Sequence, residues 1–139
     1  MPQKLAIAEL RRSPSAHLRV LLADDFEPWR SHVRSFLQSN TKWEIVAETC
    51  DGLEAVQRAQ KLHPDVVILD LSMPRLNGLE AARKIHQCSP DSAIAFLSEN
   101  SDEDVIDAAL ETGAVGYVQK RELAAKLLPI LQAALQVRS

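Results

Sequence analysis

The chain has 139 residues, which suits a single domain with one buried core. Its apolar fraction of 46% and charged fraction of 25% are ordinary for a soluble globular protein, and the net charge of −3 argues against bulk nucleic-acid binding. No apolar run approaches the roughly 18 residues that cross a bilayer, so we expect no membrane partner. Cys50 and Cys88 lack metal-ligand spacing, which is typical of reduced thiols in a cytoplasmic protein.

The first 16 residues look like a leader outside the domain, which we expect to span residues 17–139. Pro14 would end any short helix that the apolar residues of this leader form. Beyond the leader, five short apolar runs of strand type alternate with segments of helical periodicity. The predicted strands are residues 18–23, 43–48, 66–69, 93–97 and 114–119.

Helices are predicted between these strands and after the last one. The first begins near Pro28, and four apolar residues follow on one helical face: Trp29, Val33, Phe36 and Leu37. The turn Asp51-Gly52 precedes the second helix. A later helix, residues 102–112, begins with acidic side chains that the helix dipole favours and ends at Gly113.

The final segment, residues 121–138, is strongly apolar and helical in pattern. Pro129 lies inside it, and a proline in a helix interior costs about 3 kcal/mol. We therefore expect this helix to start late, near Leu128, or to break at the proline, rather than to run unbroken.

Strands that alternate with helices imply parallel strands joined by right-handed crossovers. The sequence thus predicts an α/β protein, a doubly wound (βα)5 fold around a five-stranded parallel sheet. The carboxyl ends of parallel strands share one edge of such a sheet, and ligands bind at that edge. Side chains that close the strands are therefore the first candidates for a functional site.

Acidic residues close two of the predicted strands. Asp70 follows the run 66–69, which reads as a strand buried on both faces, and Asp24 and Asp25 follow the first strand. Taken alone, Asp70 is explained as a residue that caps the turn after its strand, and Asp25 as an acidic residue in the first turn of the next helix. Together the three carboxylates form a hard-oxygen pocket that suits Mg²⁺ (or Mn²⁺) and in which negative charges raise one another's pKa.

Two other strands end in polar side chains. Ser98 follows the strand 93–97, and Lys120 follows the strand 114–119. By itself Ser98 is an ordinary helix cap and Lys120 an ordinary solvated lysine. The combination of these residues indicates a functional site, because an acid pair, an acid, a hydroxyl and a lysine each close a different strand of one sheet.

Four motifs occur in order along the chain: VLLADD at 20–25, DLSMPRLNG at 70–78, FLS at 96–98 and GAVGYVQK at 113–120. With these motifs the sequence resembles the response-regulator receiver domains of two-component signalling over residues 18–137. The GAVGY run is similar to receivers of the NarL/FixJ type. The resemblance implies a flavodoxin-like (CheY-like) sheet with the strand order 2-1-3-4-5.

The resemblance also implies roles at the site. Asp70 would accept a phosphoryl group from a sensor histidine kinase or a phosphotransfer protein. Asp25 and Asp70 would hold Mg²⁺ directly, Asp24 would act through water, and the backbone carbonyl of Ser72 would complete the protein ligands. A carboxylate nucleophile of this kind makes the chain a phospho-acceptor rather than a turnover enzyme.

Ser98 and Lys120 would each bind a phosphoryl oxygen, as the resemblance implies. Ser98 would move toward the phosphate and Tyr117 would rotate into the vacated space, so that the face of helix 102–112, the last strand and the final helix changes. The alternative for Tyr117 is a half-exposed strand aromatic without a switching role.

Two other functions stay open. Glu99 follows Ser98 where receivers generally place a small or uncharged residue, which allows a degenerate receiver that binds proteins without phosphorylation. A small phosphatase of another α/β class would use Asp70 as its nucleophile. Such enzymes commonly have a second acid two residues later, but position 72 is serine, and the chain has no cap domain.

Apolar residues of the final segment exceed one buried stripe and suggest a homodimer contact. NarL/FixJ-type receivers usually carry a C-terminal helix-turn-helix, and this chain ends at Ser139 without room for one. We therefore expect a stand-alone receiver or a fragment cut at the linker, and no direct DNA binding by this chain unless such a domain was removed.

Overall fold

The computed structural model describes residues 18–39 and 42–138. Its strands form one parallel sheet in the order β2-β1-β3-β4-β5. The strands are β1 (Leu18–Ala23), β2 (Trp43–Thr49), β3 (Val66–Leu69), β4 (Ala93–Ser98) and β5 (Gly116–Gln119). The predicted fold class and the strand order 2-1-3-4-5 are confirmed.

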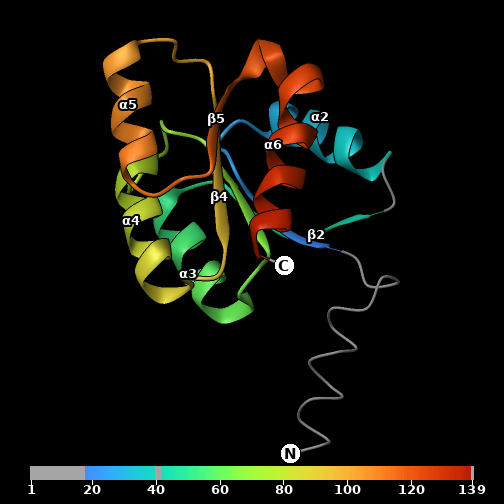
Figure 1. Cartoon of the computed structure of the whole chain (residues 1–139). Coiled ribbons are helices and arrows are strands. Elements are labelled where there is room, and N and C mark those ends of the chain that lie inside the picture. Colours follow the sequence, from blue (N-terminus) through green and yellow to red (C-terminus); the bar gives the residue numbers. More distant parts are fainter. Residues whose placement is uncertain (1–17, 40–41, 139) are drawn as a thin grey trace, which may run out of the picture.

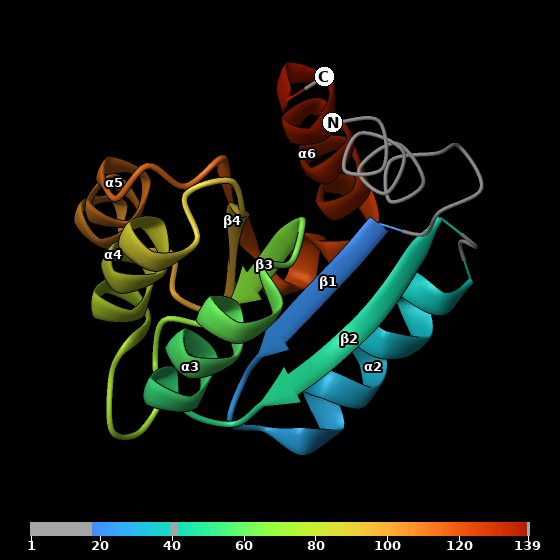
Figure 2. The ribbon, with the colours of Figure 1, turned by 90° about the horizontal axis from the view of Figure 1, so that it is seen from below.

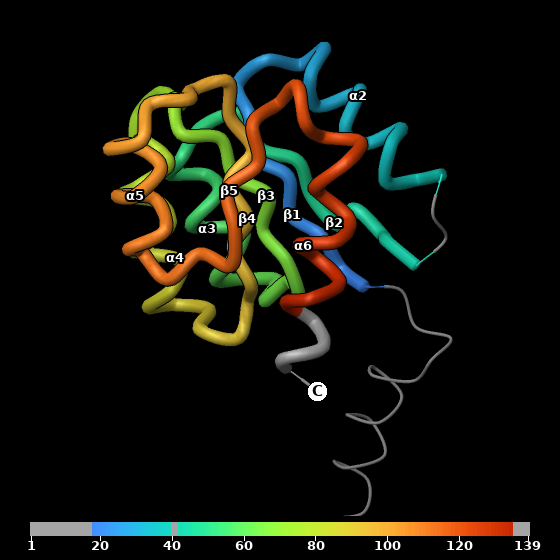
Figure 3. The backbone as a smooth tube through the Cα atoms, turned by 45° about the horizontal axis from the view of Figure 1, so that its top comes forward, coloured from blue at the N-terminus to red at the C-terminus, as the bar shows by residue number. Residues whose placement is uncertain are grey.

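Helices cover both faces of the sheet (Figures 1 and 2). The helices α2 (Glu27–Gln38) and α6 (Leu123–Arg138) pack on one face. The other face carries α3 (Gly52–Leu62), α4 (Gly78–Cys88) and α5 (Glu103–Glu111). A short 3₁₀ turn, η1 (Lys120–Glu122), joins β5 to α6. Figure 3 follows the chain through these alternating strands and helices.

Alternate residues of the same strand fill the two halves of the core. In β1, Val20 and Leu22 pack toward α2 and α6, whereas Leu21 and Ala23 pack toward the other three helices. Each residue of β3 is at most 1% exposed. Successive side chains of a strand point to opposite faces, so a run that is apolar at every position indicates a central strand covered on both sides.

The last helix differs from its prediction. α6 runs as one helix through Pro129, so the predicted late start or break is wrong. Leu123, Leu127 and Leu131 are each at most 3% exposed and pack in the core. Burying each leucine contributes about 2 kcal/mol, which together exceeds the cost of about 3 kcal/mol for an interior proline. Tertiary packing therefore holds the turn that precedes Pro129.

Other boundaries shift slightly or remain untested. β5 begins two residues later than predicted, and β2 continues to Thr49. The predicted leader, residues 1–16, lies outside the described residues, so the boundary between it and the domain 17–139 stays a prediction. In the part of the chain that the structure describes, no helix has the length and apolar character to cross a membrane.

Candidate functional site

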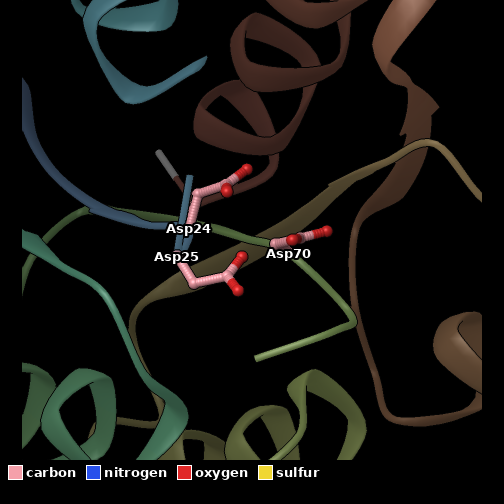
Figure 4. A group of neighbouring side chains, drawn as sticks. All are labelled: Asp24, Asp25 and Asp70. Atoms are coloured by element: carbon pink, nitrogen blue, oxygen red, sulfur yellow. The ribbon is translucent and has the colours of Figure 1, made fainter. Parts of the chain in front are cut away.

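The predicted acidic residues meet at the carboxyl edge of the sheet. β1 and β3 are neighbours, with Ala23 opposite Leu69. The next residues extend the pairing, because the Asp70 N–H donates to the Ala23 carbonyl (3.0 Å) and the Asp24 N–H donates to the Thr49 carbonyl (3.1 Å). Strand pairing therefore fixes both backbones. Figure 4 shows the side chains of Asp24, Asp25 and Asp70 gathered at this edge.

The three carboxylates have the dimensions of a metal site. One oxygen from each of Asp24, Asp25 and Asp70 lies within 4.8 Å of the others. Asp24 and Asp70 are 2% and 7% exposed, whereas Asp25 is open to solvent. Mg²⁺ in proteins takes a few carboxylate oxygens and keeps several waters, so a site with two buried acids and one exposed acid suits it.

Lys120 reaches this cluster from the end of β5. Its Nζ lies 2.7 Å from Asp24 Oδ2 and 4.0 Å from Asp70 Oδ2, and its side chain is 12% exposed. Lys120 opens η1, so the chain turns immediately after the strand and leaves the ammonium beside both buried carboxylates. The ammonium is placed to pair with oxygens of any anionic group that is attached to Asp70.

The charges at the site act most strongly on Asp70. Burial raises the pKa of Asp70 to about 6, the negative charge of Asp24 adds to the rise, and Lys120 opposes it. Ionising Asp70 beside two other carboxylates therefore costs free energy, unless more positive charge is present. A bound divalent cation supplies that charge and keeps the carboxylate ionised.

Ser98 and Tyr117 share one partner, Asn100, in the loop that follows β4. The Asn100 N–H donates to Ser98 Oγ (3.2 Å), and the Tyr117 hydroxyl donates to the Asn100 carbonyl (2.7 Å). Ser98 is buried and Tyr117 half-buried, and burial raises the pKa of the Tyr117 hydroxyl. Asn100 thus links the end of β4 to the aromatic ring on β5. Sequence reasoning missed Asn100, because no pattern marks it within a loop.

Ser72 lies in the loop between Asp70 and α4, with its side chain exposed. The loop closes tightly, because the Gly78 N–H donates to the Leu71 carbonyl (2.7 Å). A Cβ at position 78 would lie 2.2 Å from the Asp70 carbonyl oxygen, so this close approach requires glycine. That the Ser72 carbonyl is a metal ligand stays a prediction.

Two residues of α2 contact the site although sequence reasoning did not place them there. Arg30 Nη1 donates to the Asp24 carbonyl (2.6 Å), and Arg30 Nε lies 3.4 Å from Glu48 Oε1. The ring of Trp29 lies beneath the Lys120 ammonium, with 5.2 Å between Nζ and the ring centroid. Helical periodicity assigned Trp29 to an apolar face, but it carries no information about which side chain covers the ring.

The family and the proteins to which this chain is similar agree with the resemblance seen in its sequence motifs. Residues 20–132 match the model of the response regulator receiver domain. The chain is 37% identical over 103 residues to the transcriptional regulatory protein DegU of Brevibacillus brevis, and 36% identical over 117 residues to LiaR of Bacillus subtilis. The matches cover 74% and 84% of this chain but 44% and 56% of those proteins. The chain thus spans about half the length of these relatives.

Solved structures agree with this similarity. The response regulator domain of Thermotoga maritima CheB is 30% identical with a TM-score of 0.81, covering 86% of this chain and 97% of that one. A LuxR-family response regulator from Aurantimonas sp. SI85-9A1 is also 30% identical, with a TM-score of 0.82 and coverage of 88% and 87%. A protein-glutamate methylesterase of Methanosarcina acetivorans is 39% identical, but only 30% of its length is matched.

Proposed function

Because this chain belongs to the response regulator receiver domain family, we propose that Asp70 accepts a phosphoryl group from the phosphohistidine of a histidine kinase or phosphotransfer protein. A carboxylate oxygen of Asp70 bonds to phosphorus, and the phosphorus–nitrogen bond breaks with its electron pair left on the imidazole. One observation carries the proposal: three carboxylates and the Lys120 ammonium converge at one edge of the sheet.

Receiver domains bind Mg²⁺ at an acidic pocket, and in this chain the cluster of Asp24, Asp25 and Asp70 forms that pocket. In our proposal Asp25 and Asp70 hold Mg²⁺ (or Mn²⁺) directly, Asp24 acts through water, and the Ser72 carbonyl is a further ligand. The bound cation neutralises charge on the phosphoryl oxygens. The contacts of Asp24 support its indirect role, because Oδ1 accepts the Phe26 N–H (2.9 Å) and Oδ2 pairs with Lys120.

Lys120 and Ser98 bind the phosphoryl oxygens in this proposal. Lys120 Nζ is 4.0 Å from Asp70 Oδ2, so a phosphoryl group on Asp70 brings its own oxygens within reach of the ammonium. The Ser98 hydroxyl donates to another oxygen. Both residues stabilise charge on the transferred group in this proposal.

Phosphorylation then changes the face formed by α5, β5 and α6. When Ser98 turns toward the phosphate, its hydrogen bond from the Asn100 N–H is lost, and Tyr117 rotates into the space that Ser98 leaves. This is a two-state equilibrium that a local charge biases. The contacts of Asn100 with both Ser98 and Tyr117 support the coupling.

Intact-mass spectrometry tests the phosphorylation. After incubation with Mg²⁺ and phosphoramidate, the wild type is expected to gain one phosphoryl group and Asp70→Asn none. Beryllofluoride with Mg²⁺ mimics a phosphoryl group on a carboxylate, so an adduct is expected with the wild type and not with the variant. A wild type that gains no phosphoryl group while folded contradicts the proposal.

A second candidate function, a receiver that binds partners without phosphorylation, is favoured by Glu99. Its side chain is exposed and lines a pocket of about 400 Å³ together with Lys120 and Arg121. A carboxylate there repels an anionic phosphodonor. If the wild type gains no phosphoryl group and Glu99→Gln gains one, the phosphorylation-independent function holds for the native chain.

The partners of this chain follow from phosphotransfer. The donor is a histidine kinase or a phosphotransfer protein, and the chain itself acts as an acceptor without turnover. The methylesterase activity in the name of one relative belongs to that protein, in which the matched part is a minor fraction. A homodimer through α6 stays a prediction. The predicted lack of DNA binding also stays untested, since DegU and LiaR are transcriptional regulators.

A further inference from the structure

We infer that Trp29 is a positioning residue that holds the Lys120 ammonium at the phosphoryl-transfer site through the face of its indole ring. The inference rests on the proposed function of Asp70 and deepens it. Its starting point is the distance of 5.2 Å between Lys120 Nζ and the ring centroid. A cation within about 6 Å of an indole face is attracted by the negative potential of that face, and tryptophan attracts it more strongly than other aromatic residues do.

The Trp29 ring is itself held in place. The His32 ring lies one helical turn further along α2, with 4.9 Å between the two ring centroids. Trp29 also packs against the core cluster that contains Val33 and Leu37. The ring therefore offers a fixed surface to Lys120, whose ammonium sits on a flexible four-carbon chain.

The chemistry of Trp29 favours more than a packing role. Within the described residues, its buried Nε1 has no hydrogen-bond acceptor. A buried N–H without a partner is destabilising, and leucine would fill the same position without that cost. What the indole adds over an apolar side chain is its electron-rich face, and Lys120 lies over that face.

Trp29 becomes more important once a cation occupies the acidic pocket. The closest partner of Lys120 is Asp24 Oδ2, at 2.7 Å, and Asp24 also belongs to the proposed metal site. A divalent cation there would repel the ammonium, and it would draw on the negative charge of Asp24 through the bridging water. The indole carries no net charge, so its attraction for the ammonium would be the same with and without the cation.

The ring also closes off a competing position for the lysine. Trp29 and Lys120 line the same pocket as the exposed Glu99. Without the ring, the ammonium is free to turn toward the Glu99 carboxylate and away from Asp70. Trp29 thereby keeps Lys120 on the side of the pocket where the phosphoryl group arrives.

Phosphorylation rates of the full chain test this inference. Trp29→Leu keeps apolar volume and removes the ring face, whereas Trp29→Phe keeps a weaker face. With phosphoramidate and Mg²⁺, Trp29→Leu is expected to lower the rate constant about 3- to 30-fold, and Trp29→Phe to restore most of it. In a Lys120→Gln background, Trp29→Leu is expected to change the rate less than about twofold, because it acts through the lysine.

Equal losses in both backgrounds would overturn the inference, since they would indicate a structural effect that is independent of Lys120. The absence of a loss in the native background would overturn it as well. A wild type that gains no phosphoryl group overturns the proposed function and the inference together. A wild type that is phosphorylated while Trp29→Leu reacts equally fast overturns the inference alone.

Tryptophan fluorescence measures the contact without phosphoryl transfer. The chain has two tryptophans, so a Trp43→Phe background isolates the emission of Trp29. Lys120→Gln is expected to shift that emission in the metal-free protein, because it removes a charge from above the ring. Lys126→Gln serves as control, since Lys126 of α6 pairs with Glu122 of η1 and its side chain is 54% exposed. An unchanged spectrum in Lys120→Gln would contradict the contact even if Trp29→Leu failed to fold.

Discussion

Arg75 ties the loop that follows Asp70 to the start of α3 through Asp51. Its Nη2 lies 3.0 Å from Asp51 Oδ2, while Asp51 Oδ1 caps α3 by accepting the Glu54 N–H (2.8 Å). Arg75 has a φ of 67°, in the left-handed region that non-glycine residues seldom adopt. One buried carboxylate therefore starts a helix and also anchors the loop beside the phospho-acceptor.

Asp51→Ala is expected to lower the free energy of unfolding by about 1 to 3 kcal/mol, because it removes a helix cap together with an ion pair. Urea denaturation measures the loss. Asn77→Ala is the matched control, because Asn77 caps α4 by accepting the Glu80 N–H (3.0 Å) without such an ion pair. A loss no larger than that of Asn77→Ala would show that the pair with Arg75 contributes nothing.

Gly78→Ala is expected to destabilise the fold and to reduce phosphorylation. The added Cβ would lie 2.2 Å from the Asp70 carbonyl oxygen and 2.7 Å from Leu71 Cα, so the backbone of the phospho-acceptor has to move. Forcing extra atoms into a packed site costs about 1 to 3 kcal/mol. Urea unfolding and intact-mass spectrometry on the same samples measure both effects.

Gly113→Ala is the control for this substitution. Gly113 has a φ of 96°, but the nearest atom to an added Cβ is 3.6 Å away, on the His86 side chain. Gly113→Ala is expected to lower the free energy of unfolding by about 1 kcal/mol through backbone strain alone and to leave phosphorylation unchanged. Equal phosphorylation in the two variants would mean that the contact of Gly78 with Asp70 does not position the acceptor.

The raised pKa of Asp70 makes stability depend on pH in the metal-free protein. The folded chain keeps the proton up to a pH of about 6, whereas the unfolded chain releases it near 3.8. The free energy of unfolding therefore falls as the pH rises through this window. Above the window, the folded chain bears the full cost of an ionised Asp70 carboxylate. Relative to the wild type, Asp70→Asn is expected to gain about 1 to 3 kcal/mol between pH 4 and pH 7.

Urea unfolding of both proteins in EDTA at a series of pH values measures this difference. Adding Mg²⁺ at pH 7 is expected to stabilise the wild type more than Asp70→Asn, because the cation binds the native, ionised site. A difference between the two proteins that stays constant with pH would mean that Asp70 titrates as an ordinary carboxyl group.

Lys120→Met is expected to lower the free energy of unfolding by about 2 to 4 kcal/mol, because it leaves the buried Asp24 carboxylate without its positive partner. Added Mg²⁺ is expected to restore part of the loss. The control is Lys126→Met, which breaks a surface pair with Glu122 and is expected to cause no measurable change. Equal unfolding midpoints for the two variants would contradict the pairing of Lys120 with Asp24.

The sheet and the acidic residues at its edge were predictable because their causes lie in the local sequence. An apolar run such as Val66–Leu69 indicates a buried strand, and topology brings the ends of parallel strands together. Asp24, Asp25 and Asp70 therefore lie together as the pattern predicted. The prediction for Pro129 was wrong because intrinsic helix propensity is local, whereas the burial of leucines on both sides of the proline is a tertiary effect.

Details of the site that depend on side chains from other elements were not predictable. The turn at Asp51-Gly52 is visible in the sequence, but its partner Arg75 is set by how the later loop folds. In the same way, the spacing of α2 assigned Trp29 to an apolar face and did not show that Lys120 would cover its ring. Such contacts join residues far apart in the chain, and neither periodicity nor composition encodes them.

The proposed phosphoryl-transfer site is tested most directly by a high-resolution crystal structure of the chain with Mg²⁺ and beryllofluoride. We expect one metal ion with carboxylate oxygens of Asp25 and Asp70 at about 2.1 Å, and beryllofluoride bonded to Asp70 with a fluorine facing Lys120. A metal ion that touches only one of these carboxylates, or beryllofluoride bound anywhere other than Asp70, would show that residues 25 and 70 do not form one phosphoryl-transfer site.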